Sequence, residues 1–198
     1  MSGVNFNKGK NQMKISDIVL SVATYLGKSG VEKYLLNGDA ENATSETLMQ
    51  TDVLTRLANL VINEIAGGYI PMIKKENITV DNGKIYIADL SENALEIKNV
   101  LYNGQEVSFK IKGAYVQVFA AANEIEYSYM PHNYGLTDEI GYSEKDISST
   151  ALSFGVAAEY CLTEWRFEEA VMWRERFTDA IKKFCKIKNG KILERAWV

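Results

Sequence analysis

Residues 78–87 read ITVDNGKIYI, and at this point the apolar residues change from helical spacing to strand-like alternation. Asp81-Asn82-Gly83 is typical of a tight turn, and apolar residues alternate on both sides of it, so the stretch predicts a β-hairpin. Another turn signal, Asn103-Gly104, lies further along the chain. We expect five or six short antiparallel strands between residues 78 and 130, arranged as a meander that forms a small sandwich or barrel.

Helical periodicity lies on both sides of these strands. Apolar residues recur at helical spacing from Ser16 to Ala66 and again from Ile147 to Lys186, which predicts a helical hairpin and a second helical pair. Ser16 is a candidate N-cap of the first helix, and Asp146 or Ser148 is expected to start the second helical pair. The predicted fold class is therefore α+β: a helical hairpin, an inserted antiparallel β-rich subdomain, a second helical pair that completes a four-helix frame, and a C-terminal arm.

The same pattern predicts how the chain divides. Its 198 residues, of which 46% are hydrophobic and only two are proline, suffice for one large core or two small ones. We expect a flexible N-terminal segment over residues 1–14, a helical frame over 15–70 and 147–187, a β-rich insertion over 71–131, a linker over 132–146, and a C-terminal arm over 188–198.

The last helix is expected to begin near Arg166. Acidic residues stand in its first turn and lysines in its last, which suits the helix dipole. Trp173 stands off the inward stripe of this helix and is a candidate for a second contact surface. The inward stripe is expected to comprise Phe167, Ala170, Val171, Phe177, Ile181 and Phe184.

The charge of the chain is concentrated at its ends. The formal charge is −4, but residues 1–14 carry +3 and residues 181–198 carry +5, so the remainder carries −12. Basic ends on an acidic body suit contacts with an acidic partner or with phosphate, and they equally suit two solvated tails. Nucleic-acid binding is an alternative function, and it would use Lys182, Lys183, Lys186, Lys188 and Lys191.

Residues that usually carry catalysis are sparse. His132 is the only histidine and is expected in a loop, where a surface position is more typical than a catalytic one. Cys161 and Cys185 do not have a metal-binding spacing, so we expect free buried thiols in a reducing compartment. The chain has no glycine-rich phosphate-binding motif. We therefore expect no enzyme activity, no metal and no cofactor.

Neither export nor membrane insertion is expected. The N-terminus has no long apolar stretch of the kind that a signal peptide contains. The sequence also has no run of about 18 apolar residues, the length that a spanning helix requires. We expect a protein made in the cytoplasm, without a membrane partner.

The chain ends in Arg195-Ala196-Trp197-Val198, after a turn signal at Asn189-Gly190. Apolar residues after a basic run are costly to leave in water, so we expect this end to dock on its own body or, as the favoured alternative, on a neighbour. Several tyrosines lie in the predicted strands. Because tyrosine is enriched in interfaces, a receptor- or carbohydrate-binding role for the strands is another alternative.

Three stretches in the first part of the chain are IVLSV at residues 18–22, LNGDA at 36–40 and NEIAGGY at 63–69. In this order they resemble the opening of head-to-tail adaptor (connector) proteins of short-tailed bacteriophages, of the tail tubular protein A type. Near the other end, ALSFGVAAEYCL at 151–162 followed by RAWV at 195–198 is similar to structural proteins from the morphogenesis regions of phages.

The resemblance implies a structural virion protein at the neck of the particle. Such adaptors form a homo-oligomeric ring, typically of twelve copies, below the portal protein and around the channel through which genomic DNA passes without sequence-specific contact. Tail or nozzle proteins attach on the other side. The candidate interface residues are then Trp173, Lys182, Lys183, Lys186, Lys188, Lys191, Arg195, Trp197 and Val198.

Overall fold

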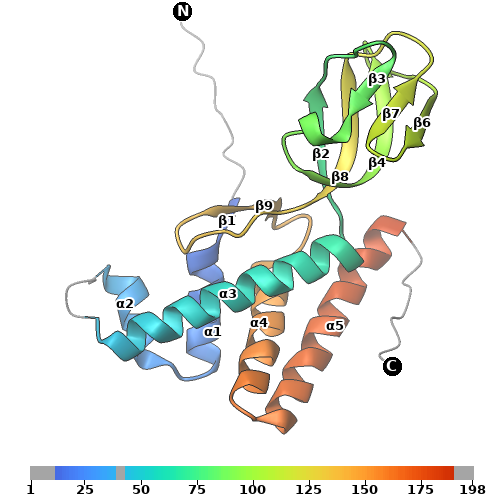
Figure 1. Ribbon diagram of the computed structural model, residues 1–198. Helices are drawn as coiled ribbons and strands as arrows, with labels where there is room; N and C mark the ends of the chain where they lie inside the picture. Colours follow the sequence, from blue (N-terminus) through green and yellow to red (C-terminus); the bar gives the residue numbers. More distant parts are fainter. Residues whose placement is uncertain (1–11, 39–42, 190–198) are drawn as a thin grey trace, which may run out of the picture. The chain divides into compact units, whose positions relative to one another are not determined.

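The structure, a computed structural model, describes residues 12–38 and 43–189, with side chains described over 13–38 and 43–185. Its fold is α+β, as predicted (Figure 1). The chain divides into two compact units. We call Met1–Ile62 together with Asn133–Val198 the helical unit, and Asn63–His132 the β unit. The first boundary falls inside a helix, so the β unit begins earlier than the predicted insertion.

Among the described residues, the helical unit contains five helices, the third of which continues into the β unit, and a two-stranded sheet. In Figure 1, α4 and α5 form an antiparallel pair, and α1 lies beside α4. The strands β1 and β9 pair antiparallel. The elements are β1 (Gln12–Lys14), α1 (Ile15–Tyr25), α2 (Ser29–Asn37), α3 (Ser45–Gly68), β9 (Glu139–Ser143), α4 (Ser149–Thr163) and α5 (Phe167–Asn189).

Close packing of three helices depends on Gly155 in α4. A Cβ atom at this position would lie 2.8 Å from Cγ1 of Val61 in α3 and 3.0 Å from ring carbons of Phe177 in α5. Both distances are shorter than a normal carbon–carbon contact. The absence of a side chain therefore lets the three backbones approach one another.

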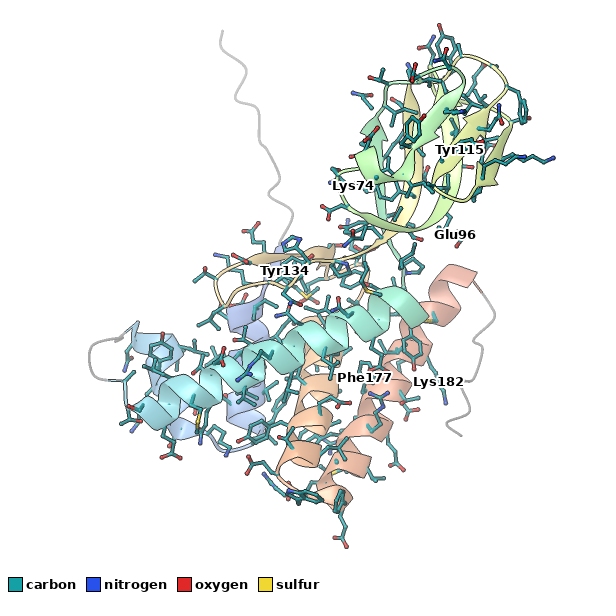
Figure 2. The ribbon with its side chains drawn as sticks, viewed as in Figure 1. Lys74, Glu96, Tyr115, Tyr134, Phe177 and Lys182 are labelled. Carbon is teal, nitrogen blue, oxygen red and sulfur yellow. The ribbon has the colours of Figure 1, made fainter. Side chains whose placement is uncertain are left out.

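A buried asparagine ties the segment before β9 to α3. The side-chain amide of Asn59 donates a hydrogen bond to the carbonyl of Tyr134 at 2.8 Å and accepts one from its N–H at 2.7 Å. The hydroxyl of Tyr134 in turn accepts a hydrogen bond from the N–H of Gly141 in β9 at 3.3 Å. Asn59 thus satisfies both backbone groups of Tyr134, a buried residue 75 positions away. Tyr134 is labelled in Figure 2.

Two details of the first predicted helical hairpin are wrong. The stretch from Ser16 to Ala66 contains three helices rather than two, because Gly27, with a φ of +68°, separates α1 from α2. The first helix begins at Ile15, before the predicted cap. The third helix follows Thr44, whose hydroxyl accepts a hydrogen bond from the N–H of Thr47 at 3.1 Å.

Two segments predicted to be irregular contain strands. The strand β1 lies in the predicted flexible segment 1–14, and β9 lies in the predicted linker 132–146. The two strands are only three and five residues long, which gives a weak strand signal in the sequence. They pair with each other, and Met13, Ile140 and Tyr142 on them are buried. The remaining residues 1–11 lie outside the described residues. The predicted cap Ser148 is confirmed, since its hydroxyl accepts a hydrogen bond from the N–H of Ala151 at 3.1 Å.

The β unit contains seven strands in two antiparallel sheets. One sheet has the order β2-β8-β4-β5 and the other has the order β3-β7-β6. The elements are β2 (Met72–Asn77), β3 (Lys84–Tyr86), the short 3-10 helix η1 (Ile87–Asp89), β4 (Asn93–Tyr102), β5 (Gln105–Glu106), β6 (Phe109–Lys112), β7 (Tyr115–Val118) and β8 (Glu124–Met130).

The two sheets pack face to face as a small sandwich, one of the two forms predicted. Alternating residues of both sheets point into the common core, as is usual for packed antiparallel sheets. The buried core residues are Ile85, Val116 and Val118 from the three-stranded sheet, and Ile97, Val100, Ile125 and Tyr127 from the four-stranded sheet.

The predicted meander is wrong, because β2 pairs with β8, the last strand of the unit. The predicted hairpin at residues 78–87 is also wrong: β3 pairs with β7, and a single bridge between Asp81 and Lys84 spans the turn. The turn at Asn103-Gly104 is confirmed, with φ values of +50° and +81°, and it joins β4 to β5.

Candidate interaction surfaces

Trp173, the predicted anchor for another subunit, lies inside the helical unit. Its side chain is 7% exposed, and its ring stacks on Tyr25 of α1 with 5.4 Å between the ring centroids. Phe154 of α4 lies 5.7 Å from Trp173 by the same measure. The prediction that Trp173 stands off the inward face of α5 is therefore wrong, because that face packs against two helices at once.

An exposed apolar patch lies where α4 turns into α5. We call it the hairpin tip, and it consists of Leu162, Trp165, Phe167, Val171 and Met172. Trp165 is 79% exposed, and its ring meets that of Phe167 edge to face at 5.9 Å. Phe167 and Val171 were predicted on the inward stripe, and this prediction is wrong, since both are more than half exposed. Grouped large apolar side chains on a surface are typical of a protein contact.

The backbone at Trp165 is unusual for a tryptophan, because its φ is +59°. Its N–H donates a hydrogen bond to the carbonyl of Leu162 at 3.2 Å, and the N–H of Arg166 donates one to the carbonyl of Cys161 at 2.8 Å. These two bonds form a Schellman motif, in which glycine normally occupies the left-handed position. A side chain there costs about 1 kcal/mol. The chain thus keeps a large exposed aromatic residue where glycine would be less strained.

Arg166 fixes the first turn of α5 beside the hairpin tip. Its Nε donates a hydrogen bond to Oε1 of Glu169 at 2.7 Å, and a second nitrogen bonds the other carboxylate oxygen. The hydrogen bond to Glu169 raises the pKa of the Arg166 guanidinium above its ordinary value. A two-pronged contact of this kind fixes orientation as well as distance. It therefore fixes the conformation of the backbone from which Trp165 and Phe167 project.

The predicted basic interface residues lie at the end of α5 and beyond it. Lys182 is half-buried and Lys183 is exposed, and Phe177 and Lys182 are labelled on α5 in Figure 2. A shallow groove runs along the outer face of α5, and its lining residues are Val171, Arg174, Glu175, Thr178, Asp179 and Lys182.

The other predicted basic residues are not fully described. Lys186 and Lys188 belong to α5, which continues past the predicted helical frame to Asn189, but their side chains lie outside the described ones. The remaining predicted interface residues lie outside the described residues, and they are Lys191, Arg195, Trp197 and Val198.

A second exposed stripe runs along α3, and sequence analysis did not identify it. Met49 and Leu60, both exposed, stand eleven residues apart and so share one side of the helix. Between them, Asp52 and Arg56 form an exposed ion pair with 2.6 Å between the carboxylate and guanidinium atoms. We call Met49, Asp52, Arg56 and Leu60 the α3 stripe. These residues stand three or four positions apart, so the stripe could have been recognised in the sequence from its helical spacing.

The β unit carries a polar network on its edge strand β2. The N–H of Ser91 and the hydroxyl of Tyr127 donate hydrogen bonds to Oε1 of Glu76 at 3.1 and 3.0 Å. Nearby, Lys74 and Glu92 form an ion pair at 3.1 Å. Burial alone would raise the pKa of the Glu76 carboxyl, but the hydrogen bonds from Ser91 and Tyr127, with the charge of Lys74, lower it below its ordinary value of 4.5.

The described residues offer little catalytic chemistry. Within 12–38 and 43–189, no group of three or more histidine, cysteine, aspartate or glutamate residues could hold a metal ion. Burial raises the pKa of the Cys161 thiol, which lowers its thiolate fraction and its reactivity. His132 is exposed. No helix in the described part of the chain is both long enough and apolar enough to span a bilayer.

Comparison with known proteins does not assign the chain to a family. No protein-family model matches the chain, and no curated protein matches it.

Proposed function

We propose that this chain is a structural virion protein that forms a ring adaptor between the portal and the tail at the phage neck, around the DNA channel. The main support for the proposal is the exposure and backbone conformation of Trp165. This residue has a large aromatic side chain, 79% exposed, on a left-handed backbone. Both features cost the free protein stability. A contact that buries the ring in an assembly explains why the residue is there.

A ring of identical subunits needs two different surfaces on each subunit, because each copy contacts its two neighbours through unlike faces. The helical unit has two candidates. The hairpin tip presents aromatic and aliphatic groups, and the α3 stripe presents Met49 and Leu60 around an exposed ion pair. We propose that the tip of one copy packs on the α3 stripe of the next, which buries Trp165.

The other partners follow from the place of such a ring in the particle. The portal protein would lie on one side of it and tail or nozzle proteins on the other, with about twelve copies in the ring as the resemblance implies. The body of the chain is acidic, with a charge of −12 between its basic ends. An acidic channel lining would let genomic DNA slide, because acidic side chains release no counterions from the DNA and so do not bind its phosphates tightly.

The proposal is tested by the mass of the full-length protein in solution, alone and mixed with a portal ring, measured by light scattering behind a sizing column. We expect the wild-type protein to assemble stoichiometrically on the portal. The variant Trp165→Gly should keep its fold and lose at least about tenfold in assembly affinity, the loss typical of an interface hot spot.

Phe119→Ala is the matched control, because Phe119 is also a largely exposed aromatic residue, in the β unit, with 65% exposure. It should assemble as the wild type does. A protein that ignores the portal, or equal losses in the two variants, would contradict the adaptor proposal. If the same protein bound DNA with a steep salt dependence, nucleic-acid binding through the terminal lysines would replace it.

A further inference from the structure

The outward face of α5 combines negative charge with exposed apolar side chains. Glu175 and Asp179 are exposed on this face, and neither forms an ion pair with another described residue. One to two turns toward the start of the helix, Val171 and Met172 are exposed as well. Two basic residues also line the groove: Arg174, which pairs with Glu159 of α4 at 3.6 Å, and Lys182 near the other end. Between them the groove offers the carboxylates of Glu175 and Asp179, followed by an apolar end.

The chain after α5 has the complementary composition. Residues 190–198 read GKILERAWV, with two basic residues, one acidic residue and four large apolar ones. The first residue after the helix is Gly190. Glycine directly after a helix permits the left-handed turn that reverses chain direction. A segment that reverses here would run back along α5.

The length of this segment matches the groove. Trp197 lies seven residues beyond the turn at Gly190, so a fully extended chain carries it at most about 25 Å back, which equals the rise of about 17 helical residues. This reach brings Trp197 level with Met172. By the same comparison, Arg195 comes level with about residue 177, between Glu175 and Asp179. One alignment of the two segments therefore places Arg195 beside the two carboxylates and Trp197 beside the apolar end of the groove.

We propose that residues 190–198 of each chain fold back and dock in the groove on the outer face of its own α5, with Arg195 between Glu175 and Asp179 and Trp197 on Val171 and Met172. The one-residue connection keeps the segment at a high effective concentration near this face, which favours its own helix over that of a neighbour. In the docked state Trp197 and Arg195 are not accessible to other partners. The inference concerns the free protein and does not depend on the adaptor function.

Limited trypsin digestion of the full-length protein tests the docking, with cleavage after Lys191 followed by intact mass. Cleavage requires the segment to leave the groove, so its rate reports the undocked fraction. We expect Trp197→Ala to raise the rate about tenfold, because it removes the largest buried surface. Glu175→Lys should raise it about threefold to tenfold by replacing attraction with repulsion. Combining Glu175→Lys with Arg195→Glu should restore slow cleavage.

Glu168→Lys is the matched control, because Glu168 is an exposed carboxylate on α5 one turn beyond the reach of Trp197. It should leave the cleavage rate unchanged. Equal acceleration by Glu168→Lys, no effect of Trp197→Ala, or no restoration in the charge-exchange variant would overturn the proposal. Protection should also survive a hundredfold dilution. Protection that fades on dilution together with a dimeric mass would place the segment on a neighbouring copy and overturn docking on its own helix.

Discussion

In the helical unit an uncharged side chain joins two distant segments, whereas in the β unit a charged side chain secures an edge strand. In the helical unit, the amide of Asn59 binds both backbone groups of Tyr134. In the β unit, the carboxylate of Glu76 on β2 accepts hydrogen bonds from Ser91 and Tyr127. The two units should therefore respond differently to the same perturbation: the helical unit to changes in packing, and the β unit also to pH.

The helical unit also contains two tryptophans in contrasting environments. Trp173 is 7% exposed within an aromatic cluster, and Trp165 is 79% exposed on a strained turn. One ring stabilises the fold and the other is left for a contact outside the unit. The variants below test both contrasts, in order of decreasing expected effect on stability.

Trp173→Ala should have the largest effect. It removes a ring packed between Tyr25 and Phe154, and the free energy of unfolding should fall by about 3 to 5 kcal/mol. Urea denaturation followed by circular dichroism measures the loss. Trp165→Ala is the same truncation at an exposed position and should cost less than about 1 kcal/mol. Similar losses in the two variants would contradict the assignment of the two rings.

Asn59→Ala should have the next largest effect. Both backbone groups of Tyr134 would be left buried without their hydrogen-bond partner, at a cost of about 2 to 3 kcal/mol. Gln50→Ala is a suitable control, because Gln50 lies on the same helix and its amide bonds only the exposed Glu46 at 3.1 Å. The control should lie within about 0.5 kcal/mol of wild type. If Asn59→Ala lowers the free energy of unfolding no more than the control does, water must replace the amide as the partner of Tyr134.

Glu76→Gln should have a smaller effect that depends on pH. The pKa of Glu76 is lower in the folded protein than its ordinary value of 4.5. A carboxyl shifted in this direction adds stability above its unfolded pKa, and this stability is lost as the pH falls through the folded pKa. We expect wild type to exceed the variant by about 1 kcal/mol or less at neutral pH, and this gap to close as the pH falls below 4.5.

Tryptophan emission follows the helical unit by itself in this experiment, because residues 63–132 contain no tryptophan, whereas tyrosines lie in both units. The near-ultraviolet circular dichroism of tyrosine that is lost before tryptophan emission changes should therefore report the β unit, and we expect this loss at a higher pH. Asp89→Asn, which removes an exposed carboxylate from the same unit, is the control and should follow wild type. An unchanged pH profile for Glu76→Gln would show that the network does not stabilise the β unit.

Trp165→Gly should have the smallest effect, and it should be of opposite sign. Glycine relieves the strain of the left-handed position, so the free energy of unfolding should rise by about 0.5 to 1 kcal/mol. Glu164→Gly, at the preceding residue with a φ of −93°, offers no such relief and should lower it by a few tenths. A loss in Trp165→Gly would mean that its contact with Phe167 holds the hairpin together.

Local turn chemistry was readable from the sequence where it acts within a few residues. The Asn103-Gly104 turn was predicted correctly because its two positive φ values suit these two residue types. The strand β2 was missed because MIKKEN shows only weak apolar alternation, and its partner β8 lies about 50 residues away. The interface prediction failed at Trp173 for a similar reason: periodicity shows that a helix has an apolar face, but not how wide a face its neighbours cover.

The sequence by itself determined the α+β class, the position of most helices and strands, the cap at Ser148 and the turn at Asn103-Gly104, because these depend on neighbouring residues and on the period of apolar ones. Only the tertiary structure decided which aromatic side chains are buried. Phe167 and Val171 lie outside and Trp173 lies inside because α1 and α4 pack against the Trp173 side of α5. Burial is a property of the assembled helices, since it depends on which surfaces meet.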